Sequence, residues 1–184
     1  HKEAHHSKHG EHGHHDHAKT GMLDPHIWLS PPLVKLQAQT VLQALLGVIT
    51  RPEQQKILRD NHARFIKRVE TLDSTIHAQL KDKKHRTFLV YHPAWGYFAK
   101  AYDLHQAAVE TEGKEPGPKE LVRLVELAKE KHLRVIFVEP QFSQKSARTL
   151  AQEIGASVAV LDPLAYAWEE NLLQVAKALG ESLQ

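Results

Sequence analysis

The segment RVIFV at residues 134–138 decides the fold, because it is a continuous run of β-branched and aromatic residues followed directly by Glu139-Pro140. Strands with one face in solvent alternate between apolar and polar residues. Uninterrupted apolar strands are instead typical of parallel sheets that are covered on both faces. We therefore expect 134–138 to be a buried strand of a parallel sheet.

Similar segments on either side predict three more strands, namely TFLVY at 87–91, HQAAVE at 105–110 and SVAVL at 157–161. Helical patterns separate and follow them, near 95–102, after the polar loop 111–118, at 143–154 and from about 166 to 183. Strands that alternate with helices favour βαβ units. The predicted fold class is α/β, with a parallel four-stranded sheet and flanking helices.

The preceding part of the chain predicts two helices. Ser30 is the expected N-cap of the first, with Pro31 and Pro32 in its first turn. The sequence TRPE at 50–53 predicts a capping box and a proline at the start of a second helix over 52–81. At 1.5 Å per residue this helix is about 45 Å long, whereas a small domain is only about 30 Å across. We expect it to run along more than one body, or to support a partner that the chain lacks.

This pattern divides the chain into a disordered loop at 1–21, a helical segment at 22–84 that includes the long helix, and an α/β lobe at 85–184.

Hydrophobic residues make up 41% and charged residues 25%, an ordinary globular balance. The net charge of +2 gives no reason to expect nucleic acid or an anionic membrane as a partner. No apolar run reaches the ~18 residues of a membrane-spanning helix, so we expect no membrane insertion. The absence of cysteine excludes disulfides and thiolate metal sites.

Histidine is the anomaly, since 15 are present and eight of them fall in the first 17 residues. The opening HKEAHHSKHGEHGHHDHAKTG has no hydrophobic period and cannot contribute to a core. A purification tag is one interpretation, but acidic and basic residues interrupt this tract. We favour a natural loop that collects a late first-row divalent ion, with four accessory ligands: His12, His14, His15 and His17.

Possible metal ligands follow all four predicted strands: His92, Glu110, Glu139 and Asp162. The carboxyl ends of parallel strands lie at one edge of the sheet, where ligands bind. His26 precedes the first helix, and His26, His92 and a carboxylate would suit zinc. The alternatives are a structural role for His92 and, for Glu110 and Glu139, a role as acceptors for backbone donors, which we favour for Glu110.

Five blocks of the sequence resemble the signature blocks of the ZnuA-like solute-binding proteins of metal ABC importers, in the same order. They are DPHIWLSP at 24–31, YHPAWGYFAKAYDL at 91–104, EGKEPGPKEL at 112–121, VIFVEPQFS at 135–143 and LDPL at 161–164. The resemblance places metal ligands at His26, His92 and Asp162, with water as the alternative to Asp162. It gives Glu139 a supporting role. Manganese-binding relatives carry glutamate at the position of His92, so the resemblance implies Zn²⁺ rather than Mn²⁺.

The same resemblance implies a binding protein and not an enzyme. Such a protein binds zinc with high affinity in the cell envelope and delivers it to a metal ABC permease. The expected location is the periplasm or the outer face of the membrane. Members have two lobes, and this chain starts inside the histidine-rich loop that follows the first lobe. We therefore expect the N-terminal lobe, its histidine ligand and the secretion signal to be absent, leaving bare apolar surface along the long helix. That lobe or a second chain would complete the site. The alternatives are a zinc metallochaperone or storage fragment and, less favoured, a hydrolase in which Glu139 activates water.

Overall fold

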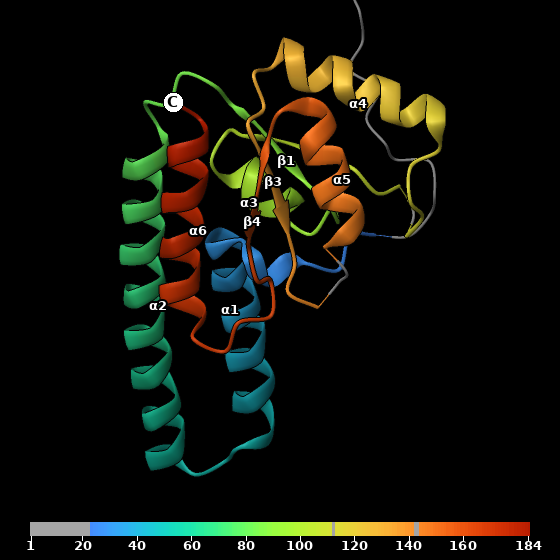
Figure 1. Ribbon diagram of the computed structural model, residues 1–184. Helices are drawn as coiled ribbons and strands as arrows, with labels where there is room; N and C mark the ends of the chain where they lie inside the picture. The colour runs from blue at the N-terminus through green and yellow to red at the C-terminus, as the bar shows by residue number, and fades with distance from the viewer. Residues whose placement is uncertain (1–22, 112, 142–143) are drawn as a thin grey trace, which may run out of the picture.

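The computed structural model describes residues 23–111, 113–141 and 144–184 (Figure 1). The predicted loop 1–21 and its accessory histidines lie outside the described residues. The strands are β1 (Thr87–Val90), β2 (His105–Ala108), β3 (Val135–Val138) and β4 (Ser157–Val160). The helices are η1 (Ile27–Leu29), α1 (Pro31–Val48), α2 (Pro52–Leu80), α3 (Gly96–Ala101), α4 (Pro118–Glu130), α5 (Lys145–Ile154) and α6 (Trp168–Ser182).

The four strands form one sheet in the order β2-β1-β3-β4, and every pairing is parallel. This confirms the predicted α/β fold with a parallel four-stranded sheet. The chain adds β2 on one side of β1 and β3 on the other, so the carboxyl ends of β1 and β3 flank the point where the strand order reverses. Ligands of open α/β sheets bind at such a point.

Helices cover both faces of the sheet, which explains why its central strands are apolar without alternation. Phe88 and Val90 of β1 point into a core cluster shared with α2, α3 and α6. Leu89, between them, points to the opposite face and a second cluster with α4 and α5. Figure 1 shows α2 and α6 on one side of the sheet and α4 and α5 on the other.

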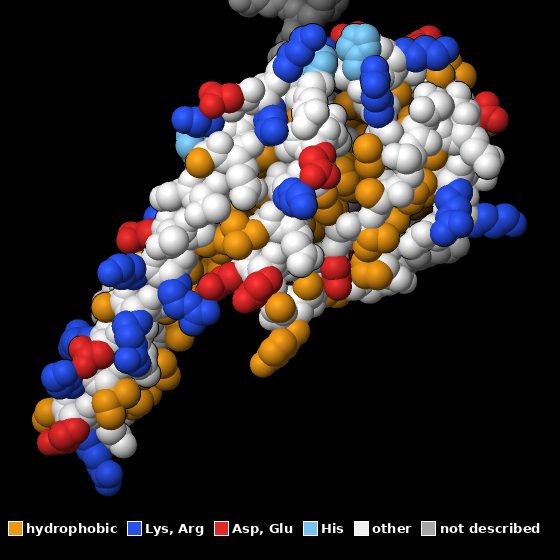
Figure 2. Space-filling view, turned by 60° about the vertical axis from the view of Figure 1, so that its left-hand side comes forward, with side chains coloured by type: hydrophobic (Ala, Val, Ile, Leu, Met, Phe, Trp, Pro, Cys, Tyr) orange, Lys and Arg blue, Asp and Glu red, His pale blue; other side chains and the backbone are white. Residues whose placement is uncertain are grey.

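The long helix α2 has 29 residues and is therefore roughly 44 Å long. Its second half is buried through Val69, Leu72, Ile76 and Leu80. Its first half forms a hairpin with α1 that projects beyond the rest of the molecule and carries hydrophobic side chains on its surface (Figures 1 and 2). Ile57 there is 57% exposed. Bare apolar surface along part of this helix was expected from the sequence.

The start of α2 differs from the predicted capping box. Pro52 is the first helical residue, as expected, but the N-cap is Arg51 and no side chain caps the helix. A proline disfavours the helical conformation in the residue before it. Arg51 accordingly has an extended backbone, with φ −76° and ψ 121°, and Thr50 lies one residue too early to act as the cap.

The sequence predicts a boundary at residue 84 between the helical segment and the α/β lobe. The core cluster on the α2 side contains residues from both of these segments, because α6 packs against α2. The domain boundaries themselves stay a prediction.

None of the helices in residues 23–111, 113–141 and 144–184 combines the length and apolar character needed to cross a bilayer.

We predict that Ile76→Ala lowers the free energy of unfolding by about 2–5 kcal/mol, because it leaves a cavity at a fully buried position. The matched control is Ile57→Ala in the same helix, where exposure limits the loss to about 0.5 kcal/mol. Urea unfolding followed by circular dichroism measures both. Equal losses would contradict the assignment of α2 to a buried and a projecting half.

Candidate metal centre

His26 and His92 come together from distant parts of the chain. His26 lies in the turn before η1, and His92 follows β1 at the carboxyl edge of the sheet. Their ring centroids are 5.5 Å apart and their planes meet at 78°. Two imidazoles that share one zinc ion at Zn–N distances of about 2.0–2.1 Å have centroids roughly 5 Å apart. The two rings therefore lie close to the separation that a shared ion requires.

Asp24 orients His26. Its Oδ1 accepts a hydrogen bond from the His26 backbone amide at 2.9 Å and lies 2.7 Å from Nδ1 of the ring. A carboxylate at Nδ1 holds the proton on that nitrogen, so the lone pair that can bind a metal is on Nε2. The His26 side chain is 18% exposed, which is enough for an ion to reach it.

Glu110 orients His92 in the same way, with Oε1 3.1 Å from Nδ1. The backbone places the two residues side by side, because the Glu110 amide donates to the Tyr91 carbonyl at 2.9 Å. Glu110 was expected to accept hydrogen bonds from backbone donors. The structure shows that it also contacts the imidazole of His92, an arrangement typical of histidines that bind metals, and its role toward backbone donors stays a prediction.

Glu139 follows β3 and is only 7% exposed. Within the described residues its Oε1 has no hydrogen-bond partner. Burial raises the pKa of the Glu139 carboxyl; the nearby His92 opposes this shift, and the charges of Glu110 and Asp162 add to it. An unpaired buried carboxylate oxygen is costly. A cation bound beside it would compensate that cost.

Asp162 follows β4, and protein donors already hold its carboxylate. Its Oδ1 accepts from Gln141 Nε2 at 2.8 Å and from the Leu164 amide at 3.0 Å. Among the residues that the structure describes, no three His, Asp or Glu side chains are gathered tightly enough to hold a metal ion. The structure thus brings His26 and His92 together, and the role of Asp162 as a third ligand stays a prediction.

Two indoles fix the segment that carries His26. Trp28 Nε1 donates to the Pro163 carbonyl at 2.9 Å, and Trp168 Nε1 donates to the Trp28 carbonyl at 2.8 Å. The Trp28 ring also contacts the His26 ring edge-on, with centroids 5.3 Å apart. These contacts attach the turn before α1 to the loop between β4 and α6 and to the start of α6.

Sequence reasoning missed Asp24 and Gln106. An aspartate two residues before a histidine has a recognisable signal, because Asp side chains bond to backbone donors two residues on. Gln106 Oε1 accepts from the Trp95 amide at 2.7 Å and supports the segment after His92. Nothing in the sequence indicated that contact.

The parallel sheet, the long helix and two carboxylate-oriented histidines at the carboxyl edge give this chain the architecture of a metal-binding lobe of a solute-binding protein. The chain belongs to the family described as zinc-uptake complex component A, periplasmic, whose profile matches residues 1–183. This confirms the resemblance seen in the sequence blocks. The description of this family is that of a periplasmic component of zinc uptake.

Individual relatives agree with this assignment. The chain is 34% identical to the zinc-binding protein AdcA of Streptococcus pyogenes over 145 residues, covering 77% of this chain and 27% of AdcA. It is 33% identical to the high-affinity zinc uptake system protein ZnuA of Bacillus subtilis over 144 residues, covering 77% of this chain and 44% of that protein. A crystal structure of ZnuA superposes with a TM-score of 0.83 at 43% identity, covering 88% of this chain and 62% of that chain. The chain thus spans less than half the length of these two curated relatives.

We predict that Glu110→Gln lowers zinc affinity about tenfold, because it weakens the acceptor that orients His92. Competition with a chromophoric zinc chelator measures the affinity of the tightest site. Glu181→Gln, at an exposed position of α6, is the matched control and leaves the affinity unchanged. Equal affinity of both variants would show that the contact between Glu110 and His92 does not support metal binding.

Metal-free Glu139→Gln is expected to gain stability relative to the unchanged chain as the pH rises. Folding raises the pKa of Glu139, so the folded chain keeps this carboxyl protonated up to a higher pH than the unfolded chain does. The unchanged chain therefore loses stability between the usual pKa of a glutamate and the raised value. The gain of the variant is absent below this range and complete above it. Urea unfolding at several pH values with a chelator present tests this, and a gain that does not vary with pH would refute it.

Proposed function

We propose that this chain captures Zn²⁺ outside the cytoplasmic membrane and delivers it to the permease of a metal ABC importer. The protein ligands are His26, His92 and Asp162. The observation that carries the proposal is the pair of imidazoles at the carboxyl edge of the sheet, with centroids 5.5 Å apart. The names of the relatives, which describe zinc binding and zinc uptake, support the choice of metal and role.

The composition of the site favours zinc over manganese. Imidazole suits late first-row ions, whereas manganese prefers sites richer in carboxylate and water. Each ring has a carboxylate at Nδ1, which raises the basicity of the other nitrogen and fixes its direction. Zinc binds only neutral imidazole, so binding to a protonated histidine releases a proton. Zinc affinity therefore falls as the pH drops below about 6.

Two imidazoles and one carboxylate leave one position of a zinc tetrahedron open. Water, a further lobe or a second chain would fill that position. An open position also allows exchange of the ion, as delivery to a permease requires. The accessory histidines His12, His14, His15 and His17 would bind zinc weakly and raise its concentration near the site.

Zinc titration by calorimetry tests the proposal on the unchanged chain and on the double variant His26→Ala/His92→Ala. We expect one tight stoichiometric site that the double variant loses, with weaker binding left in the residues of the N-terminal tract. The double variant His77→Ala/His105→Ala, at two exposed positions, is the control and keeps the tight site. Weak binding that is identical in all three proteins would overturn His26 and His92 as ligands.

A further inference from the structure

His85 and His132 form a second pair of imidazoles, at the amino-terminal edge of the sheet. Their ring centroids are 5.6 Å apart and their planes meet at 54°. This is nearly the separation of His26 and His92 at the opposite edge. It is likewise close to the roughly 5 Å between two imidazoles that share an ion.

The sheet register explains why these two rings meet. His85 precedes β1 and His132 precedes β3, and these two strands are parallel neighbours with Leu89 opposite Ile136. Counting back equally along both strands brings His85 opposite His132. His85 and His92 lie at opposite ends of β1, roughly 20 Å apart. An ion bound by the second pair is therefore separate from one bound at the candidate metal centre.

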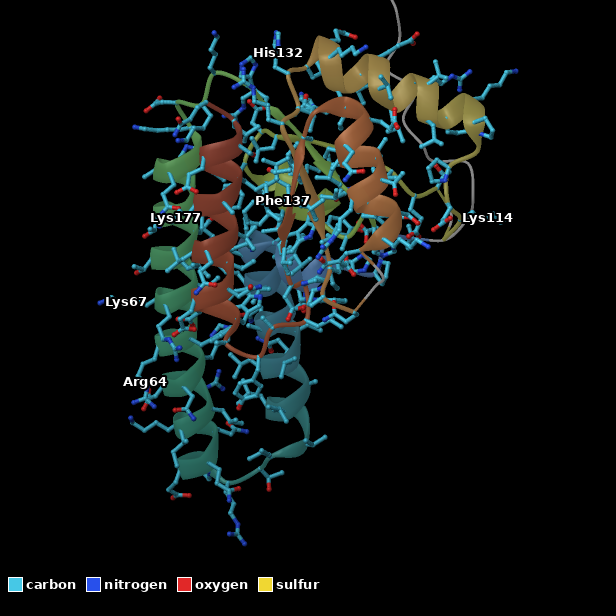
Figure 3. All side chains as sticks on the ribbon, in the orientation of Figure 1. Arg64, Lys67, Lys114, His132, Phe137 and Lys177 are labelled. Carbon is cyan, nitrogen blue, oxygen red and sulfur yellow. The ribbon has the colours of Figure 1, made fainter. Side chains whose placement is uncertain are left out.

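The backbone holds both histidines in place. The His85 amide donates to the Leu183 carbonyl at 3.1 Å. His132 has φ 55°, in the left-handed region that few residues other than glycine adopt. This conformation ends α4 and lets the Leu133 amide donate to the Ala128 carbonyl at 2.8 Å. Figure 3 shows His132 at the upper end of the molecule, beside the end of α4.

No other group competes with a metal for the ring nitrogens, since in the described part of the chain no hydrogen bond joins either ring to another residue. Lysines and arginines flank both histidines in the sequence. Lys131 is paired with Glu130 at 2.8 Å, whereas Lys84 and Arg134 are exposed. Such surroundings repel calcium and magnesium, which bind through oxygen ligands and charge. Coordinate bonds to imidazole favour the later first-row ions instead.

We propose that His85 and His132 bind one late first-row divalent ion, such as Zn²⁺, at a surface site in which water completes the coordination. The site binds more weakly than the candidate metal centre, because it has two protein ligands and no carboxylate orients either ring. Its existence does not depend on the proposed function of His26 and His92.

Histidine modification by diethyl pyrocarbonate, read residue by residue with peptide mass spectrometry, tests the proposal on the full chain. Free Zn²⁺ is set with a metal buffer. We expect zinc to slow the modification of both His85 and His132, by roughly tenfold once free zinc exceeds the dissociation constant about tenfold. Exposed His77 keeps its rate. Unchanged rates at His85 and His132 would overturn the site.

The variant His132→Asn identifies the cause of protection. Asparagine tolerates the left-handed backbone of this position, so the end of α4 is kept. In this variant zinc no longer protects His85, whereas protection at His26 and His92 persists. His105→Asn is the control and leaves His85 protected. If zinc still protects His85 in His132→Asn, the pair is not the site and the proposal is overturned. If zinc fails to protect only His26 and His92, the result counts against the proposed function alone.

Discussion

The parallel pairing of β1 with β3, in which Leu89 lies opposite Ile136 and Val90 opposite Phe137, is the constraint on which the other parts of the structure depend. It sets the point where the strand order reverses, and so the edge where His92 and Glu139 follow adjacent strands. It also aligns the residues before both strands. The same register therefore places a histidine of the candidate centre at one end and the pair His85–His132 at the other.

Charge is distributed unevenly around the candidate centre. Glu110 and Asp162 both act on Glu139, whose burial already disfavours ionisation, and His92 is the group that opposes them. Each of the two imidazoles has a carboxylate partner at Nδ1. A divalent charge added beside these carboxylates would relieve their repulsion, while the imidazoles would select among the ions that charge alone would accept.

The sequence was sufficient for the features that depend on local chemistry. The apolar run 134–138 predicted a buried strand, the strand–helix alternation predicted a parallel sheet, and Pro52 predicted the start of α2. It failed where two local rules compete, since the proline that starts α2 also prevents the capping box at Thr50. It also could not assign the partners of Glu110 and Asp162, because these side chains meet residues from other strands and loops. The register of β1 and β3, which brings His85 to His132, has no signal in either strand alone.

The two indole hydrogen bonds at Trp28 and Trp168 join segments separated by about 140 residues of chain. Movement of the turn that holds His26 away from this loop and from the start of α6 requires both hydrogen bonds to break. Under the proposed function, retention of an ion at His26 would therefore depend on how often the start of α6 frays, and a bound ion would in turn slow that fraying. Substitutions in α6 that never touch the metal would then alter its residence time at the centre.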